Sequence, residues 1–337
     1  MGLKFCSGRV AFRMNWQRRT LLALIVMALL LLVAASRPTV RISRAATLSL
    51  PFDQLAPLLP GWNLQQESAG SRFLLHELDD LQRPMDVLAV ADRQLFVDAW
   101  RQAQSSGTAS HTPVRWWLCF ARNELVLAYL PRSRYASQIN ASNWMQILLR
   151  PGVESGYADP KADPEGYNTL LAWKLAERYY HQPGLYQKLK AAVPAGHLRA
   201  HSVALLALLQ TGELDYIWEY RSVAEQHHLK FVELPAQINL GDPQRASLYR
   251  QVSVKLPGNR PGTTTEVHGA PILYAATIPS TAPNPAGGLA FLQKLVSPDG
   301  QAVLRRNFQL PLTPARLEGD TAAAPAALRQ HLQGGRR

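Results

Sequence analysis

Two acidic residues occupy positions where side-chain chemistry is plausible, and the first of them is Glu219. Glu219 and Tyr220 follow a strand predicted over Asp215–Trp218, at the point where the chain enters a helix. A carboxylate at the mouth of a buried strand costs free energy unless a partner or a ligand meets it. Ligands of open α/β sheets collect at the carboxyl ends of strands. Glu219 is therefore a candidate ligand-binding residue, with an ion pair to Arg221 as the structural alternative.

The second acid is Asp163, which precedes a helix predicted over Tyr167–Tyr180. Pro164 and Gly166 fix a tight turn there and place Asp163 at or near the helix N-cap. Capping alone explains an Asp at such a position. Asp163 is thus a candidate only in combination with other residues.

Two hydroxyl residues, Thr47 and Ser71, lie in short turns between a strand and a helix. A helix N-terminus carries about half a positive charge and unpaired N–H groups, which makes it a natural place for an anion. The alternative is that both hydroxyl groups only cap their helices. Two such turns, together with the turn at Asp163, favour an anion-binding site.

The sequence contains none of the common enzyme motifs G-x-x-x-x-G-K, H-E-x-x-H and G-x-S-x-G. His227 and His228 are adjacent on a predicted helix and point in different directions, which does not favour a metal site. The two cysteines, Cys6 and Cys119, form no metal-binding spacing and no disulfide framework. We expect a protein that is not an enzyme and that carries no cofactor.

The elements that position these residues alternate between strands and helices, which predicts an α/β fold with largely parallel sheets. Strands are predicted over Thr39–Ile42, Asp86–Val90, Val114–Phe120, Leu125–Leu130, Asp215–Trp218, Phe231–Leu234, Leu248–Leu256 and Pro271–Ile278. Helices are predicted over Phe52–Leu59, Arg93–Gln104, Asn143–Leu149, Tyr167–Tyr180, Val203–Leu209, Pro285–Leu295 and from Pro298 to about Arg306.

The first 35 residues have the pattern of an export signal. Five basic residues and no acid precede the apolar run Leu21–Ala35, which is 15 residues long and shorter than the roughly 20 residues of a membrane-spanning helix. Small side chains near Ala35 predict a signal peptide over residues 1–35 that is cleaved after Ala35. An uncleaved signal anchor is the alternative. Both place the remainder outside the cytoplasm, in the periplasm or its equivalent.

The length of 337 residues suits two domains, and the formal net charge is +12. Removing the five positive charges of the first 35 residues leaves +7. The remaining basic residues are scattered, without a basic stripe that carries interleaved aromatic residues, so no nucleic-acid partner is expected.

From about Val40 to Pro314 the sequence resembles the archaeal-type molybdate/tungstate-binding proteins of ABC importers. The resemblance lies in Phe120–Tyr129, Asn143–Pro151, Asp163–Tyr167, Glu213–Ala224 and Leu234–Pro243. It implies a two-lobed type II periplasmic-binding-protein fold with the ligand in a cleft between the lobes. It further implies that Asp163 and Glu219 coordinate the metal centre of the oxyanion, while Thr47, Ser71 and Tyr220 surround its oxygens. The family usually has Ala-Gly-Ser where this chain has Ala45-Ala46-Thr47, which keeps a hydroxyl group but loses a glycine.

From this resemblance we expect a first lobe of residues 36–130 plus 271–317 and a second lobe of residues 131–270. The lobes would join through segments near Leu130 and Pro271 and close on the ligand like a hinge. Residues 318–337, rich in Ala and Gly, are expected to form a disordered tail.

Two carboxylates are unusual in an anion site because they repel a dianion. Molybdenum and tungsten centres can accept oxygen ligands beyond their four oxo groups, and carboxylate oxygens suit such centres. The same acids would disfavour sulfate. We therefore expect a molybdate or tungstate carrier that meets the membrane subunits of an ABC importer. The alternatives are a binding protein for another oxyanion or a ferric ion, and a signal-anchored sensory or interaction domain.

Overall fold

A computed structural model describes residues 37–257 and 262–334. The described helices and strands belong to one compact unit that begins at Thr39. The predicted signal segment, residues 1–35, lies outside the described residues.

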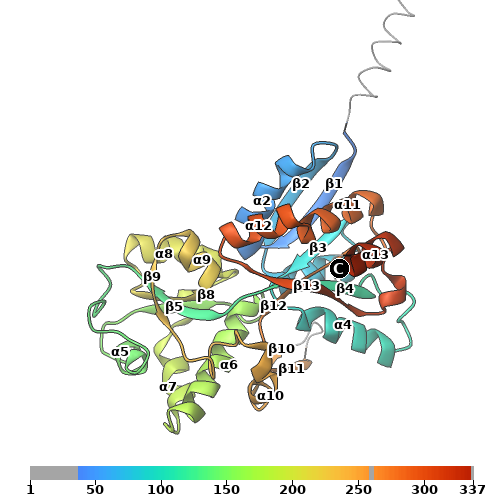
Figure 1. The fold of residues 1–337 in the computed structure, drawn as a ribbon. Coiled ribbons are helices and arrows are strands. Elements are labelled where there is room, and N and C mark those ends of the chain that lie inside the picture. Colours follow the sequence, from blue (N-terminus) through green and yellow to red (C-terminus); the bar gives the residue numbers. More distant parts are fainter. Residues whose placement is uncertain (1–36, 258–261, 335–337) are drawn as a thin grey trace, which may run out of the picture. The chain divides into compact units, whose positions relative to one another are not determined.

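Six strands form the first sheet in the order β13-β4-β12-β3-β1-β2 (Figure 1). Strand β1 pairs in parallel with β2 and β3, whereas β12 pairs antiparallel with β3 and β4, and β13 pairs antiparallel with β4. The sheet is therefore mixed, and the prediction of largely parallel sheets was wrong because strands that return from other parts of the chain run in the opposite direction. The strands are β1 (Thr39–Ala45), β2 (Asn63–Ala69), β3 (Val87–Val90), β4 (Trp116–Arg122), β12 (Leu273–Thr277) and β13 (Leu310–Gly319).

Alternate side chains of this sheet enter two separate cores, because successive residues of a strand point to opposite faces. Val87 and Ala89 join the core that contains apolar residues of α2, α11 and α12, while Leu88 and Val90 join the core that contains those of α3 and α4. Figure 1 shows α11 and α12 over one face and α4 over the other. The helices are α2 (Ser49–Leu55), α3 (Ser71–Asp79), α4 (Gln94–Ser105), α11 (Pro285–Val296) and α12 (Pro298–Arg306). We call this sheet and its helices the first lobe.

Five strands form a second mixed sheet in the order β7-β6-β8-β5-β9. Val126, Ala128 and Ile217 pack with α8 and α9, whereas Leu127 and Trp218 belong to the core that contains α6. The strands are β5 (Leu125–Tyr129), β6 (Ser155–Ala158), β7 (Leu198–Arg199), β8 (Tyr216–Tyr220) and β9 (Lys230–Glu233). The helices are α5 (Trp144–Leu148), α6 (Pro164–Tyr179), α7 (Leu185–Ala192), α8 (Leu205–Thr211), α9 (Arg221–Gln226) and α10 (Ala246–Tyr249). With the antiparallel ribbon of β10 (Ser253–Pro257) and β11 (Thr264–His268), they form what we call the second lobe.

The chain passes from the first sheet to the second earlier than predicted. Strand β4 ends at Arg122, and β5 begins at Leu125 and pairs with β8 and β9 of the second sheet. The connector between the sheets is therefore Asn123-Glu124, not a segment near Leu130. The sequence predicted two neighbouring strands here but not that they belong to different sheets. The chain returns to the first sheet with β12, which begins at Leu273.

Two further segments differ from the predictions. Residues 318–337 were expected to be disordered, but β13 extends to Gly319 and helix α13 (Ala326–Gly334) contacts α11 and β13. The buried side chains of Ala324 and Leu328 fix this segment, although its composition is rich in Ala and Gly. The strand predicted over Leu248–Leu256 is correct only for its second half, since the chain first forms α10.

Candidate functional site

Glu219 lies near the end of β8 and is completely buried. Its Oε1 atom accepts hydrogen bonds from the Ser202 hydroxyl group (2.9 Å) and from the backbone N–H of Tyr220 (2.7 Å). Its Oε2 atom is also buried but has no hydrogen-bond partner among the described residues. A buried oxygen of this kind costs free energy unless something binds it.

The ion pair between Glu219 and Arg221, the structural alternative, does not form. Arg221 instead bonds Glu124 at 2.8 Å and Glu233 at 3.1 Å, and lies 3.5 Å from Glu225. The hydrogen bond that Arg221 donates to Glu124 is the main cause that raises the pKa of the Arg221 guanidinium. Glu219 therefore lies near the end of a buried strand, and Arg221 does not compensate its charge.

The pKa of Glu219 is raised to about 8, chiefly because burial disfavours the charged carboxylate. The hydrogen bonds from Tyr220 and Ser202 oppose this rise, and the negative charge of Asp163 adds to it. The carboxyl group thus lies in surroundings that favour either a proton or a positively charged centre at the free oxygen.

Asp163 is the N-cap of α6, as the sequence predicted. Its Oδ1 atom accepts a hydrogen bond from the backbone N–H of Glu165 at 2.9 Å, and Pro164 occupies the first helical position. Burial raises its pKa to about 6, opposed by backbone N–H groups of Glu165 and Ser202. The capping interpretation is therefore correct.

The hydroxyl groups of Thr47 and Ser71 are buried and do not cap the helices at which they lie. The Ser71 Oγ atom accepts a hydrogen bond from the backbone N–H of Ala91 (3.0 Å), and the Thr47 Oγ1 atom accepts one from the Tyr274 hydroxyl group (3.2 Å). Thr47 belongs to the short 3-10 helix η1 (Ala46–Leu48) that follows β1. The capping alternative is therefore wrong for both residues.

Tyr220 joins the two lobes through an aromatic contact. Its ring meets that of Tyr274 edge to face, with 6.2 Å between centroids, and its hydroxyl group accepts a hydrogen bond from Asn168 at 3.2 Å. Because Tyr274 also donates a hydrogen bond to Thr47, it connects Tyr220 of the second lobe to the turn of the first lobe that carries Thr47.

Other contacts bring Ser71 close to Asp163. The backbone N–H of Arg72 donates to the carbonyl group of Ala162 at 3.1 Å. A Cβ atom on Gly70 would lie 2.4 Å from the same carbonyl oxygen, so only glycine allows this approach of the two lobes. The structure therefore gathers Thr47, Ser71, Asp163, Glu219 and Tyr220 around one place where the lobes meet.

Sequence reasoning missed several polar residues around this place. Ser202, Glu165 and Asn168 are buried, and Tyr167 donates a hydrogen bond to Asp92 of the first lobe at 2.7 Å. Glu165 accepts from the backbone N–H of Ala158 at 2.6 Å. Burial and the charge of Glu219 raise the pKa of Glu165 well above its usual value. Glu165 and Tyr167 lie within the motif that carries Asp163, whereas no local signal distinguishes Ser202.

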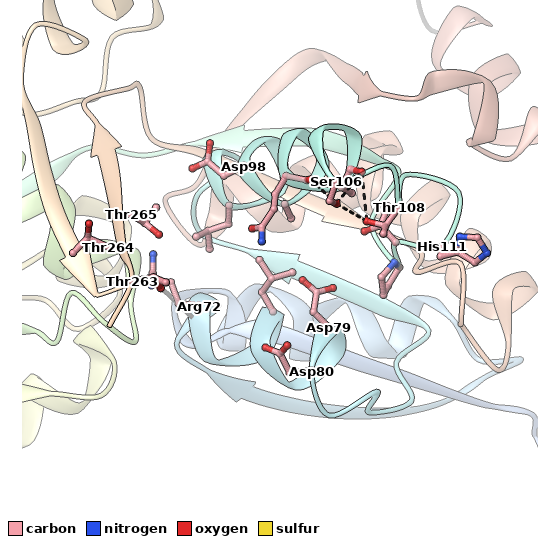
Figure 2. A pocket seen from close by; sticks show the side chains of 17 residues that line it. Arg72, Asp79, Asp80, Asp98, Ser106, Thr108, His111, Thr263, Thr264 and Thr265 are labelled. Atoms are coloured by element: carbon pink, nitrogen blue, oxygen red, sulfur yellow. Dashed lines mark hydrogen bonds between the residues drawn. The ribbon is translucent and has the colours of Figure 1, made fainter. Parts of the chain in front are cut away.

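Two cavities lie away from these residues. One of about 710 Å³ is lined by α3, α4 and Thr263–Thr265, and Figure 2 shows Arg72, Asp79 and Asp80 on one side of it with Asp98 on the other. A second cavity of about 420 Å³ is lined by residues that include Arg93, Arg101 and Arg250. Neither is lined by the candidate residues. Across residues 37–257 and 262–334, no cluster of three or more His, Cys, Asp or Glu side chains could hold a metal ion by itself.

Sequence comparison identifies the family of proteins to which this chain belongs. The chain matches the family described as bacterial extracellular solute-binding protein over residues 40–308, and it belongs to that family. An uncharacterized solute-binding protein of Petrotoga mobilis is 40% identical over 296 residues, which cover 86% of this chain and 89% of that protein. The molybdate/tungstate-binding protein WtpA of Pyrococcus abyssi is 33% identical over 303 residues, covering 81% of this chain and 84% of that protein.

Solved structures agree on the fold. The periplasmic molybdate-binding protein of Azotobacter vinelandii matches with a TM-score of 0.57 at 15% identity, covering 80% of this chain and 98% of that one. The sulfate-binding protein SubI of Mycobacterium tuberculosis matches with a TM-score of 0.56 at 13% identity, covering 82% and 88%. The type II periplasmic-binding-protein fold and the family resemblance predicted from the sequence are thus confirmed. In the described part of the chain, no helix is long and apolar enough to span a membrane.

Proposed function

We propose that this protein captures molybdate or tungstate outside the cytoplasmic membrane and delivers it to the membrane subunits of an ABC importer. The observation that carries the proposal is the buried Oε2 atom of Glu219, which has no partner among the described residues. WtpA of Pyrococcus abyssi, whose name gives this ligand, supports the choice of oxyanion.

The proposed chemistry assigns different tasks to the acids and the hydroxyl groups. Glu219 and Asp163 would donate oxygen ligands to the molybdenum or tungsten centre, which accepts hard oxygen donors. Thr47, Ser71 and Tyr220 would surround the oxo groups. Sulfate offers no comparable coordination and would meet only the repulsion of the two carboxylates, so the same residues would give both affinity and selectivity.

Isothermal titration calorimetry with sodium molybdate, tungstate and sulfate tests this proposal on the wild type, Glu219→Gln and Asp163→Asn. We expect both variants to lose molybdate and tungstate affinity strongly while sulfate affinity stays equal or improves. Glu225→Gln is the matched control, because it neutralises an acid of the same lobe that pairs with Arg221. Unchanged molybdate and tungstate affinities in folded Glu219→Gln and Asp163→Asn would reject the coordination.

One observation favours a second candidate, a binding protein for sulfate or phosphate. With a pKa of about 8, Glu219 can hold a proton at neutral pH and donate a hydrogen bond to an anion oxygen. In that case Glu219→Gln keeps a donor and should leave sulfate or phosphate binding largely intact, with no preference for molybdate in the wild type. The same titrations, extended to phosphate, distinguish the two functions.

Export is the other part of the proposal, and the extracellular family to which the chain belongs supports it. We expect residues 1–35 to act as a signal peptide and the mature protein to begin at Ser36. N-terminal sequencing of protein recovered from the cell envelope checks this. Recovery of Met1 would instead indicate an uncleaved anchor.

A further inference from the structure

Ser202 lies at the centre of the candidate site, although nothing in its local sequence indicates a role. It is completely buried and begins the short 3-10 helix η4 (Ser202–Ala204), which precedes α8. This turn contacts η1, the turn of the first lobe that carries Thr47. Ser202 is therefore enclosed by residues of both lobes.

The two hydrogen-bond donors of Ser202 serve the two candidate acids. Its hydroxyl group donates to Glu219 Oε1 at 2.9 Å, and its backbone N–H stabilises the charged form of Asp163. The ion pairs of the described residues include neither acid, so these donors take the place of a cation. One residue thus connects both carboxyl groups.

The hydroxyl group also decides which oxygen of Glu219 stays free. With the N–H of Tyr220, it places two donors on Oε1 and none on Oε2. The terminal torsion of a glutamate side chain is broad and roughly two-fold, so hydrogen bonds rather than sterics fix its orientation. Without the Ser202 hydroxyl group, the carboxylate would be held at Oε1 by the N–H of Tyr220 alone.

We propose that Ser202 is a positioning residue that presents the Oε2 atom of Glu219 to a metal-centred oxyanion and thereby sets the preference for molybdate and tungstate over sulfate. This inference rests on the proposed function. It predicts that the Ser202 hydroxyl group contributes to molybdate and tungstate affinity only while Glu219 is present.

The test is a double-mutant cycle of Ser202→Ala, Glu219→Gln and the double variant, titrated with sodium molybdate, tungstate and sulfate. We expect Ser202→Ala to weaken molybdate and tungstate binding by about 10-fold to 100-fold, the range that corresponds to a hydrogen bond to a charged group. Sulfate affinity should not fall. In the Glu219→Gln background, the same change should cost less than about threefold, because contacting residues couple in such cycles.

Two further variants separate positioning from a merely structural role. Ser202→Thr keeps the hydroxyl group and should restore most of the molybdate affinity. Ser133→Ala is the matched control, since it removes a buried hydroxyl group of the second lobe whose oxygen accepts a hydrogen bond from the backbone N–H of Leu130. It should leave all three affinities unchanged.

The outcomes distinguish this inference from the proposed function. If Glu219→Gln abolishes the molybdate preference but Ser202→Ala does not change it, the function stands and the role of Ser202 is wrong. If Ser202→Ala lowers the melting temperature and all three affinities alike, Ser202 is structural and the inference is also wrong. If Glu219→Gln itself leaves the molybdate and tungstate affinities unchanged, the proposed coordination is wrong, and so is the inference about Ser202.

Discussion

Replacing Tyr167 with Phe removes one hydroxyl group that joins the two lobes. This group, on α6, donates to the Oδ2 atom of Asp92, which follows β3 in the first lobe, over 2.7 Å. Asp92 is only 4% exposed, and its other oxygen accepts from the backbone N–H of Gln94 at 2.8 Å. In the variant, Asp92 Oδ2 loses its protein donor while the lobes are joined, but water can reach it once they separate.

The free-energy cost of the unpaired Asp92 oxygen therefore destabilises only the arrangement in which the lobes are joined. An unsatisfied buried acceptor costs about 1–3 kcal/mol, which corresponds to about 5-fold to 150-fold in an equilibrium constant. If ligand binding requires the joined arrangement, Tyr167→Phe should weaken molybdate, tungstate and sulfate binding by the same factor within this range. A uniform loss is expected because the bond contributes to closure and not to recognition of the ion.

Titration calorimetry gives the three affinities. Small-angle scattering with and without saturating molybdate gives the radius of gyration, and we expect the bound ligand to lower it. Tyr249→Phe is the matched control, since its buried hydroxyl group donates to Ala236 within the second lobe. Unchanged affinities in Tyr167→Phe, or a change in the ratio of molybdate to sulfate affinity, would refute the reasoning. Identical scattering curves with and without ligand would argue against closure altogether.

Three further predictions concern pH, closure and the C-terminal segment. Because the pKa of Glu219 is raised to about 8 from 4.5, its contribution to stability is complete below about pH 4.5 and is lost as the pH rises through 8. As the pH is raised from about 5 to about 9, the melting temperature of the ligand-free wild type should therefore fall more than that of Glu219→Gln. Over the same range the molybdate affinity of the wild type should rise, because coordination needs the charged carboxylate. Gly70→Ala should weaken binding of all three ions at least as much as Tyr167→Phe, measured by the same titrations, since a Cβ atom would lie 2.4 Å from the carbonyl oxygen of Ala162. Leu328→Ala should lower the free energy of unfolding by about 2–4 kcal/mol in denaturant titrations, without changing ion preference, because Leu328 is fully buried.

The candidate acids could be found from the sequence because local patterns determine their positions. Pro164 and Gly166 mark the start of α6 and so place Asp163 at its N-cap, and the apolar residues before Glu219 place that residue near the carboxyl end of a strand. Such signals depend on neighbours within a few residues. They do not show how a hydroxyl group is used, which is why Thr47 and Ser71 were interpretable as helix caps although their bonds go to Tyr274 and Ala91.

The remainder depends on contacts between distant segments. Ser202 contacts Glu219 only because β8 lies between β5 and β6 in the folded sheet. The residues around Ser202 in the sequence do not indicate this contact. The division between the sheets was also missed, because Leu125–Tyr129 has the same apolar character whichever sheet it enters. The C-terminal segment was misjudged from its composition, since burial of Leu328 depends on a surface that α11 and β13 supply.

The two-residue connector between β4 and β5 has a mechanical consequence. Arg122 and Leu125 are separated by three peptide steps, which reach at most about 11 Å when fully extended. Arg221 further fastens Glu124 of this connector to the start of α9 at 2.8 Å. The ends of β4 and β5 are thus held close together, so an opening or closing of the lobes would have to be a rotation about Asn123-Glu124 and not a separation of the two sheets at this point. In such a rotation, residues far from Asn123-Glu124 would move furthest, so probes attached there would report it with the largest signal.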